Sequence, residues 1–239
     1  MADMTVGSLF SGIGGFDLGL ERAGHEIVWQ VENDPFCQKV LRKHWPDVPC
    51  YEDVRDVGVH NLETVDVICG GFPCQPVSIA GKRKGQDDER WLWPEYARIV
   101  REMEPRYVLM ENVPGLLVRG MGDILGDLAR LRYDAEWEVL SAKEAGAPHR
   151  RNRVFILAYP EGEQRDGGEL YRGNRPGQIS KLRDDIPEEA PESNWWSHEP
   201  NVDRVAHGVP SKVDRMRTLG NAVVPQIAEL IGRRLRSHT

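Results

Sequence analysis

The 239-residue sequence lacks several features that mark special classes of protein. It has no apolar run approaching the roughly 20 residues of a membrane-spanning helix. Its first residues, MADMTVGSLF, show no basic region followed by a long apolar one, so we expect neither a membrane anchor nor a signal peptide. The four cysteines form no CxxC pair and no metal-ligand spacing, so we expect no metal site. Scattered thiols in a chain this long favour a reducing, cytoplasmic setting.

The sequence also lacks an excess of positive charge. Lys and Arg total 31 against 38 Asp and Glu, and the net charge of −7 alone disfavours nucleic-acid binding, because phosphate contacts need cations. Local charge matters more than the sum, however, and basic clusters occur at 82–84, 148–153 and 204–239. Each cluster fits either a solvated face or a nucleic-acid contact, and composition leaves both open.

Short apolar segments alternate with segments of helical periodicity as far as Pro160. The pattern predicts strands at 5–10, 26–32, 65–71, 106–113, 135–142 and 153–159. It predicts helices at 16–24, 35–45, 93–104 and 121–134, with Asp34 as the N-cap and Pro35 in the first position of the second helix. Such alternation is typical of an α/β fold with a doubly wound, mostly parallel sheet covered on both faces.

The pattern changes after residue 159. Residues 161–192 carry nine Asp/Glu, five Lys/Arg and few large apolar side chains, so they cannot build a core of their own. Residues 220–235 predict a turn followed by a closing helix with cations near its C-terminus. We therefore expect a main domain at 1–159, a small irregular lobe at 160–203, and a segment at 204–239 that returns to the main domain.

A glycine-rich turn, SGIGG at 11–15, joins the first strand to the first helix. Such a turn lets a nucleotide-like ligand approach the backbone at a helix N-terminus. Glu32 ends the second strand, 20 residues after Gly12, where an acid can hold ribose hydroxyls. The GxGG spacing favours an adenosine without phosphates over a dinucleotide. The alternative is that the glycines serve only the turn.

Three further candidates stand at strand ends. Cys74, in GGFPCQPVSIAGK, carries a side chain suited to nucleophilic attack, although free cysteines are most often inert and buried. Glu111 follows the apolar run RYVLM, where burial would raise its pKa and suit it to proton donation, unless it is a helix cap. Arg151 and Arg153 stand two positions apart just before a strand, so both side chains should point to the same side. Such a pair suits an anion or a carbonyl oxygen. The alternative is that they are only basic residues that lead into the strand.

In their order and in their residues these motifs resemble those of the DNA (cytosine-5) methyltransferases. The resemblance extends from Phe10 to about Pro225 and leaves out residues 160–203. The resemblance implies a Rossmann-like methyltransferase fold that uses S-adenosyl-L-methionine and releases S-adenosyl-L-homocysteine. It implies cofactor contacts in the glycine turn, after the next strands and in GNAV (220–223), namely Phe10, Gly12, Ile13, Gly14, Gly15, Glu32, Asn33, Asp53, Val54, Pro73, Leu92, Asn221 and Val223.

The resemblance also implies the roles of the other candidates. Cys74 would bond to carbon 6 of a cytosine flipped out of duplex DNA, Glu111 would hold the base, and Arg153 would bind its carbonyl oxygen, with Arg151 as a further catalytic candidate. Residues 160–203 would form a short target-recognition segment. The expected DNA contacts are Gln75, Ser78, Lys82, Arg83, Lys84, Arg90 and Arg204.

The implied substrate is double-stranded DNA, and the implied setting is a bacterial or phage cytoplasm, with a cognate restriction endonuclease as a candidate partner and a monomer favoured. Three other functions remain to be weighed. A non-catalytic DNA-binding relative is disfavoured by the intact Cys74, Glu111 and Arg153. An RNA cytosine methyltransferase is disfavoured because that branch carries a CFT-type motif after the arginines, and no cysteine here follows residue 74. A nicotinamide dehydrogenase is disfavoured by the GxGG turn.

Overall fold

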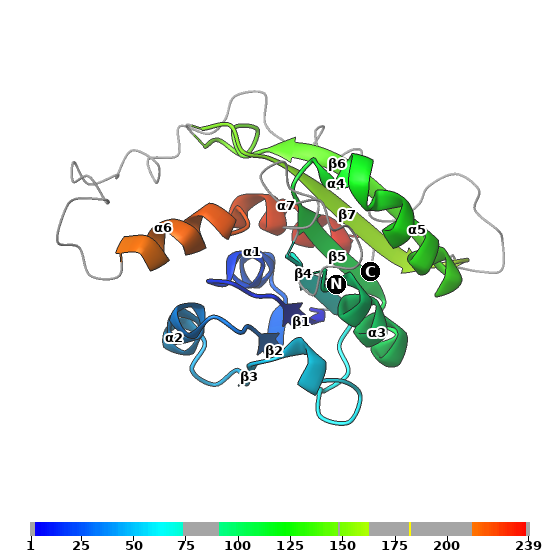
Figure 1. The fold of residues 1–239 in the computed structure, drawn as a ribbon, viewed down its shortest axis with the longest axis horizontal. Coiled ribbons are helices and arrows are strands. Elements are labelled where there is room, and N and C mark those ends of the chain that lie inside the picture. The colour runs from blue at the N-terminus through cyan, green and yellow to red at the C-terminus, as the bar shows by residue number, and fades with distance from the viewer. Residues whose placement is uncertain (1–2, 74–90, 148, 163–181, 183–211, 238–239) are drawn as a thin grey trace.

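A computed structural model describes residues 3–73, 91–147, 149–162, 182 and 212–237. One sheet runs through it in the strand order β3-β2-β1-β4-β5-β7-β6 (Figure 1). The strands are β1 (Thr5–Leu9), β2 (Glu26–Val31), β3 (Cys50–Tyr51), β4 (Val67–Gly70), β5 (Tyr107–Asn112), β6 (Tyr133–Ser141) and β7 (Asn152–Pro160). The helices are α1 (Gly15–Arg22), α2 (Pro35–His44), the 3-10 turn η1 (Val54–Asp56), α3 (Trp93–Met103), α4 (Leu116–Arg119), α5 (Met121–Arg130), α6 (Lys212–Asn221) and α7 (Pro225–Ser237).

The sheet is parallel from β3 through β5, and only β7 runs against its neighbours. The described residues of the β6–β7 connection, 142–147 and 149–151, contain no helix, which suits an antiparallel pair, whereas parallel strands need a longer crossover. This arrangement confirms the predicted doubly wound, mostly parallel α/β fold.

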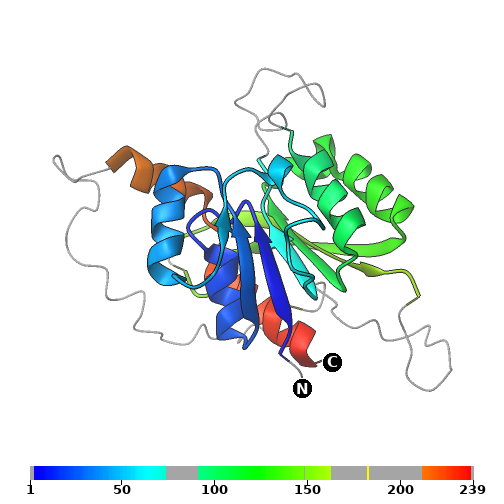
Figure 2. The ribbon, with the colours of Figure 1, turned by 90° about the horizontal axis from the view of Figure 1, so that it is seen from below.

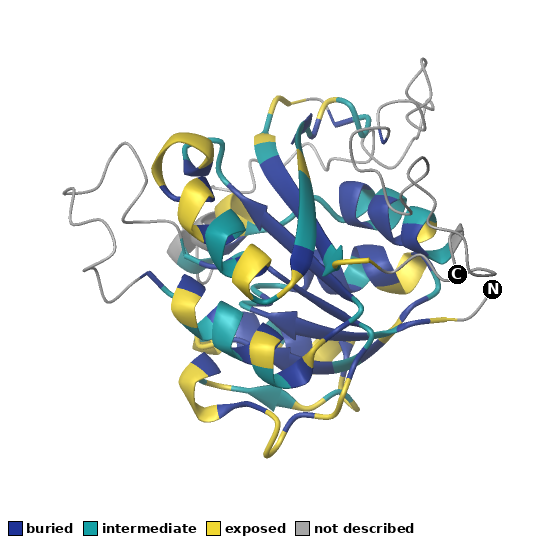
Figure 3. Ribbon diagram, turned by 90° about the vertical axis from the view of Figure 1, so that its right-hand side faces the viewer, coloured by how far each residue is buried: buried dark blue, intermediate teal, exposed yellow. Residues whose placement is uncertain are grey.

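Helices cover both faces of the sheet, and the alternation of side chains along β5 shows how. Val108 and Met110 join a core with α3 and α5, while Leu109 joins a second core with α1 and α7. Figure 2 shows these helices on opposite sides of the strands. Figure 3 shows the strands buried between them, with the exposed residues on the outer helix faces.

Local signals in the sequence account for α2. The Asp34 side chain accepts hydrogen bonds from the backbone N–H groups of Phe36 (2.8 Å) and Cys37 (3.3 Å), and Pro35 is the first helical residue. The carboxylate satisfies donors that a helix N-terminus leaves open, and Pro has no N–H to leave unsatisfied there. The predicted cap and start are therefore confirmed.

The predicted helix at 121–134 is wrong in its last four residues. α5 ends at Arg130, and Arg132 adopts a left-handed conformation (φ 64°) that turns the chain. Tyr133 then starts β6, where its ring is buried and its hydroxyl donates to the Pro105 carbonyl (2.6 Å). Tertiary contact at Tyr133 thus outweighs the local helical pattern. The elements β3, α4 and α6 were not predicted from the sequence.

The closing helix α7 packs against α1. A side chain on Gly19 would lie 2.3 Å from the Pro225 carbonyl oxygen, so only glycine permits this approach. Arg236 near the end of α7 pairs with Asp3 at 2.7 Å, which brings the two chain ends together (Figure 2). No helix among the described residues is long and apolar enough to cross a bilayer.

Candidate active site

The glycine turn between β1 and α1 is held by a carboxylate from β2. Phe10, Gly12 and Gly14 all have positive φ (53°, 57° and 84°), which curls the backbone tightly. Glu32 accepts the backbone N–H groups of Gly12 (2.7 Å) and Asp34 (2.8 Å), one on each carboxylate oxygen. Burial raises the pKa of Glu32, and these two hydrogen bonds oppose the rise. Each oxygen keeps a lone pair that can accept a ligand hydroxyl.

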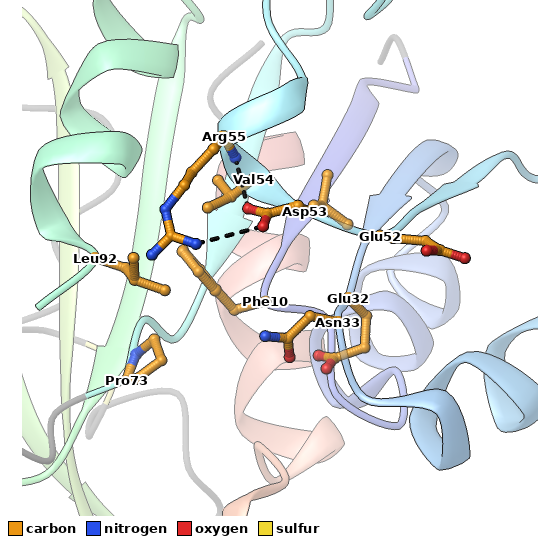
Figure 4. Close-up of a pocket in the computed structure, with 10 residues that line it drawn as sticks. Phe10, Glu32, Asn33, Glu52, Asp53, Val54, Arg55, Pro73 and Leu92 are labelled. Atoms are coloured by element: carbon orange, nitrogen blue, oxygen red, sulfur yellow. Dashed lines mark hydrogen bonds and ion pairs between the residues drawn. The ribbon is translucent and has the colours of Figure 1, made fainter. Parts of the chain in front are cut away.

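A cavity of about 280 Å³ opens where β1, β2 and β4 end (Figure 4). Ligands of open α/β sheets bind at this edge. The lining residues are Phe10, Val31, Glu32, Asn33, Glu52, Asp53, Val54, Arg55, Pro73 and Leu92. Seven of them belong to the predicted cofactor set, although they come from separate stretches of the sequence. Val31, Glu52 and Arg55 were not predicted.

The walls of this cavity combine apolar side chains with carboxylates. Figure 4 shows Phe10 and Leu92 on one side and the carboxylate-bearing side chains of Glu32 and Asp53 on the other. The Arg55 guanidinium pairs with Asp53 at 3.3 Å and its backbone N–H donates to the same carboxylate at 2.9 Å. Three carboxylates line the cavity against this one guanidinium, which suits a ligand with a flat apolar part, hydroxyls and positive charge.

Other predicted cofactor residues shape the turn instead of lining the cavity. A side chain on Gly14 would lie 2.4 Å from the Trp45 ring, and one on Gly15 would lie 2.5 Å from the Val223 carbonyl oxygen. These two glycines therefore permit close approach by the end of α2 and by the GNAV segment. Ile13 is half-buried, and Asn221 is exposed at the end of α6. Trp45 was not predicted, because an aromatic residue at a helix end carries no distinct signal.

A buried carboxylate lies next to the exit of β4. Glu111, the second-last residue of β5, is 6% exposed and its Oε1 is 2.9 Å from Arg153 Nε. A Cβ on Gly71 would lie 3.2 Å from Glu111 Oε2, and Asn112 Nδ2 donates to the Phe72 carbonyl (3.2 Å). The ENV motif thus fixes the backbone that leads, within three residues, to position 74.

The ionisation of Glu111 is poised near neutrality. Burial raises its pKa to about 7, and the charges of Arg153 and Arg151 oppose that rise. Desolvation disfavours the charged carboxylate more than the two guanidinium groups favour it. Both protonation states are therefore populated at neutral pH. The pKa is raised, as the position of Glu111 after an apolar run predicts.

Arg151, just before β7, and Arg153, its second residue, make different contacts. Arg153 faces Glu111, whereas Arg151 donates to the carbonyl oxygens of Gly220 (2.6 Å) and Ala222 (2.8 Å). The sequence predicted that both guanidinium groups would face the same anion or carbonyl oxygen. The hydrogen bonds of Arg151 lead instead to the segment that contacts the glycine turn.

Two of the described cysteines, Cys50 and Cys69, are poor nucleophiles. Burial raises the pKa of Cys69 well above its ordinary value and raises that of Cys50, which keeps both as thiols at neutral pH. Within the described ranges, no group of three or more His, Cys, Asp or Glu could hold a metal ion. The remaining predicted residues lie outside the described ones, namely Cys74, Gln75, Ser78, Lys82, Arg83, Lys84, Arg90 and Arg204.

The residues that flank 74–90 meet at the cavity. Phe72 and Trp91 pack edge to face with ring centroids 5.5 Å apart, and Trp93 lies 5.6 Å from Phe72. Pro73 and Leu92 both line the cavity. The predicted nucleophile therefore belongs to a segment that begins and ends at the candidate cofactor site. The residues just before this segment also lie beside Glu111.

The Rossmann-like fold places the candidate cofactor cavity at the carboxyl edge of the sheet. Residues 4–207 match the family model of the C-5 cytosine-specific DNA methylases, and the chain belongs to that family. It is 37% identical over 156 residues to the type II methyltransferase M.HhaI of Haemophilus parahaemolyticus, covering 63% of this chain and 47% of that protein. It is 38% identical over 173 residues to M.AquIA of Picosynechococcus, covering 63% and 69%. The chain thus spans about half to two thirds of these relatives.

Solved structures agree on the fold. A prophage-encoded E. coli protein described as a DNA modification methyltransferase superposes with a TM-score of 0.58 at 31% identity, covering 66% of this chain and 47% of that one. The Entamoeba histolytica methyltransferase EhMeth superposes with a TM-score of 0.69 at 16% identity over 100% of both chains. At that identity the second likeness concerns the fold alone.

Proposed function

We propose that this protein transfers a methyl group from S-adenosylmethionine to carbon 5 of cytosine in double-stranded DNA. The observation that carries the proposal is the convergence of seven predicted cofactor residues on one cavity, beside the Glu111–Arg153 pair. These residues come from five separate stretches of the sequence and line one cavity at the carboxyl edge of the sheet. Family membership supports the same reaction.

The cavity fits S-adenosylmethionine in its chemistry. The Phe10, Val54 and Leu92 side chains offer apolar surface for adenine, Asp53 an acceptor for its amino group, and Glu32 acceptors for the ribose hydroxyls. A Cβ on Gly12 would meet no atom within 4 Å, so a ligand has room to approach the turn. The acidic lining favours a cationic ligand. When bound, the cofactor supplies a methyl group activated by a positively charged sulfonium.

Cys74, Glu111 and Arg153 would prepare the cytosine. Carbon 5 is a weak nucleophile until the Cys74 thiolate adds to carbon 6 and makes the ring enamine-like. Protonated Glu111 would donate to ring N3, and Arg153 would donate to the carbonyl oxygen, so that both stabilise the charge that gathers in the ring. After methylation, loss of the carbon 5 proton re-forms the double bond and expels the Cys74 thiolate.

The chemistry requires the base to leave the duplex, because stacked pairing hides carbons 5 and 6 from any side chain. We propose that 1–159 forms the catalytic and cofactor-binding domain, 160–203 reads the DNA, and 204–239 completes the cofactor site. Because the lobe is short, we expect a short recognition sequence. A restriction endonuclease that cuts the same sequence is the proposed partner.

A methyl-transfer assay tests the proposal. Wild-type protein with tritium-labelled S-adenosylmethionine should place label on cytosine in duplex DNA, and Cys74→Ala should abolish the label while cofactor binding persists. Cys50→Ala is the matched control, since Cys50 is half-buried in β3 and should leave transfer intact. Label on transfer RNA in preference to DNA would instead indicate an RNA methyltransferase. Cofactor binding with no labelled cytosine in any nucleic acid would refute the proposed reaction.

A further inference from the structure

Arg151 makes a two-pronged contact across the molecule. Its side chain is half-buried, and its two terminal nitrogens donate to the carbonyl oxygens of Gly220 (2.6 Å) and Ala222 (2.8 Å), about seventy residues further along the chain. Hydrogen bonds from a charged donor are stronger than those between neutral groups. A planar guanidinium offers two donor nitrogens at a fixed spacing, whereas the donors of an ammonium group all lie on one nitrogen. Arg151 therefore fixes both the position and the orientation of the 220–222 backbone.

The same backbone presses against the glycine turn from the other side. A Cβ on Gly15 would lie 2.5 Å from the Val223 carbonyl oxygen and 3.0 Å from its Cβ. Val223 thus touches the backbone of the turn directly. The segment 220–223 is held between the Arg151 guanidinium and the start of α1, so a shift of the guanidinium changes the support of the turn.

Arg151 also belongs to the base-holding side of the site. It stands two residues before Arg153, which contacts Glu111 at 2.9 Å, and its charge reaches both of those groups. Its third donor, Nε, is buried and has no hydrogen-bond partner among the described residues. The side chain therefore lies between the Glu111–Arg153 pair and the segment that supports the cofactor turn.

We propose that Arg151 is a positioning residue for the cofactor, and that it acts by clamping residues 220–222 so that Val223 supports the glycine turn. This inference rests on the proposed function, because it takes S-adenosylmethionine as the ligand of the cavity. It gives different roles to the two arginines that the period-two spacing aims to one side: Arg153 serves the base, and Arg151 serves the cofactor through Val223. No atom of Arg151 lines the cavity.

The experiment compares three variants by equilibrium binding of tritiated S-adenosylmethionine. Arg151→Gln removes the guanidinium that bonds to both carbonyl oxygens. It should weaken cofactor binding by about tenfold or more, because two charge-assisted hydrogen bonds are lost. Arg151→Lys keeps the charge but lacks the two donor nitrogens at fixed spacing, so it should recover only part of the affinity. The exposed neighbour supplies the control, and Arg150→Gln should bind the cofactor like wild type.

Steady-state kinetics separate positioning from a direct role at the base. Arg151→Gln should raise the KM for the cofactor and keep most of kcat at saturation, whereas Arg153→Gln should lose kcat at unchanged cofactor affinity. Equal cofactor affinity in wild type and in both Arg151 variants would overturn the inference, and so would a loss of kcat alone.

Hydrogen exchange supplies a readout that needs neither cofactor nor turnover. The amides of residues 222–224 should exchange faster in Arg151→Gln than in wild type, while those of β5 should keep their protection. If wild type binds no S-adenosylmethionine, the proposed function fails, and this measurement still decides whether Arg151 clamps the segment. Unchanged exchange at 222–224 would show that it does not.

Discussion

At the scale of single residues, two of the buried carboxyl groups, Glu111 and Asp17, have a strongly raised pKa. Glu111 has a pKa raised to about 7, and Asp17 in the first turn of α1 has one raised to about 6, in both cases because burial disfavours the charge. The two differ in their surroundings. Glu111 faces Arg153, whereas Asp17 is fully buried and accepts hydrogen bonds from Ser8 (3.0 Å) and Gln30 (2.7 Å). The first belongs to the proposed chemistry and the second to the core.

The raised pKa of Glu111 predicts an alkaline decline in activity. Only the protonated form can donate to the base, so the single-turnover methylation rate should fall as pH rises through about 7. Glu111→Gln, whose amide can donate a hydrogen bond but no proton, should be slower by about a hundredfold or more and should lack this decline. Rates measured from roughly pH 6 to 9 test this. An alkaline decline that survives in Glu111→Gln would contradict the assignment.

Asp17 predicts a pH dependence of stability. The pKa of Asp17 is about 6 in the folded state against the ordinary 3.8, so the folded state favours the protonated side chain. The stability that this protonation contributes is complete below pH 3.8 and is lost as the pH rises to about 6. Asp17→Asn should remove that loss and gain about 3 kcal/mol in unfolding free energy at pH 7. The Gln30 amide can rotate to accept from the new side chain, since its Oε1 is buried without a hydrogen-bond partner among the described residues.

Urea unfolding of wild type and Asp17→Asn at several pH values measures this difference. Asp123→Asn, an exposed change in the first turn of α5, is the matched control and should follow wild type. Parallel curves for wild type and Asp17→Asn between pH 4 and 6 would show that Asp17 does not titrate there.

Sequence reasoning could find Glu111 but not Asp17. Glu111 follows an uninterrupted apolar run, which places a carboxylate at the end of a buried strand. An acid in the first turn of a helix is ordinarily a surface residue that favours the helix dipole, and nothing local marks Asp17 as buried. Its environment depends on Ser8 and Gln30, which only the pairing of β1 with β2 brings beside it.

At the scale of elements, the α1–α7 contact joins the C-terminal segment to the main domain. Gly19 allows the close approach, and Ile227, Ile231 and Leu235 bury their side chains beside Phe16. The helical period of 225–235 predicts this apolar face from sequence. The direction of β7 was less accessible, because it depends on the helix-free β6–β7 connection and not on either strand's own pattern.

Truncation of this contact should destabilise the whole domain. Ile231 is 1% exposed, so Ile231→Ala should lower the unfolding free energy by about 2–5 kcal/mol through lost burial and a new cavity. Leu219→Ala removes a comparable side chain that is 55% exposed on α6 and should change stability by less than about 0.5 kcal/mol. Urea denaturation measures both. Similar midpoints for the two variants would mean that α7 contributes little to the fold.

At the scale of the whole molecule, the candidate site is a consequence of topology. The carboxyl ends of β1, β2, β4 and β5 meet at one edge, and the antiparallel β7 starts at that edge, which brings Arg153 to Glu111. Motif order and strand pattern therefore predict most of the cavity lining. The contacts of Trp45 with Gly14 and of Val223 with Gly15 could not be predicted, because each depends on how segments far apart in the sequence pack together.

The most direct test of the central claim is covalent trapping at Cys74. Duplex DNA with 5-fluorocytosine at the methylated position blocks the final loss from carbon 5, so the bond between sulfur and carbon 6 should persist. With S-adenosylmethionine present, peptide mass spectrometry should find the nucleotide attached to Cys74 in wild type and absent in Cys74→Ser. A methylated substrate cytosine with no adduct, or an adduct on another residue, would contradict the account.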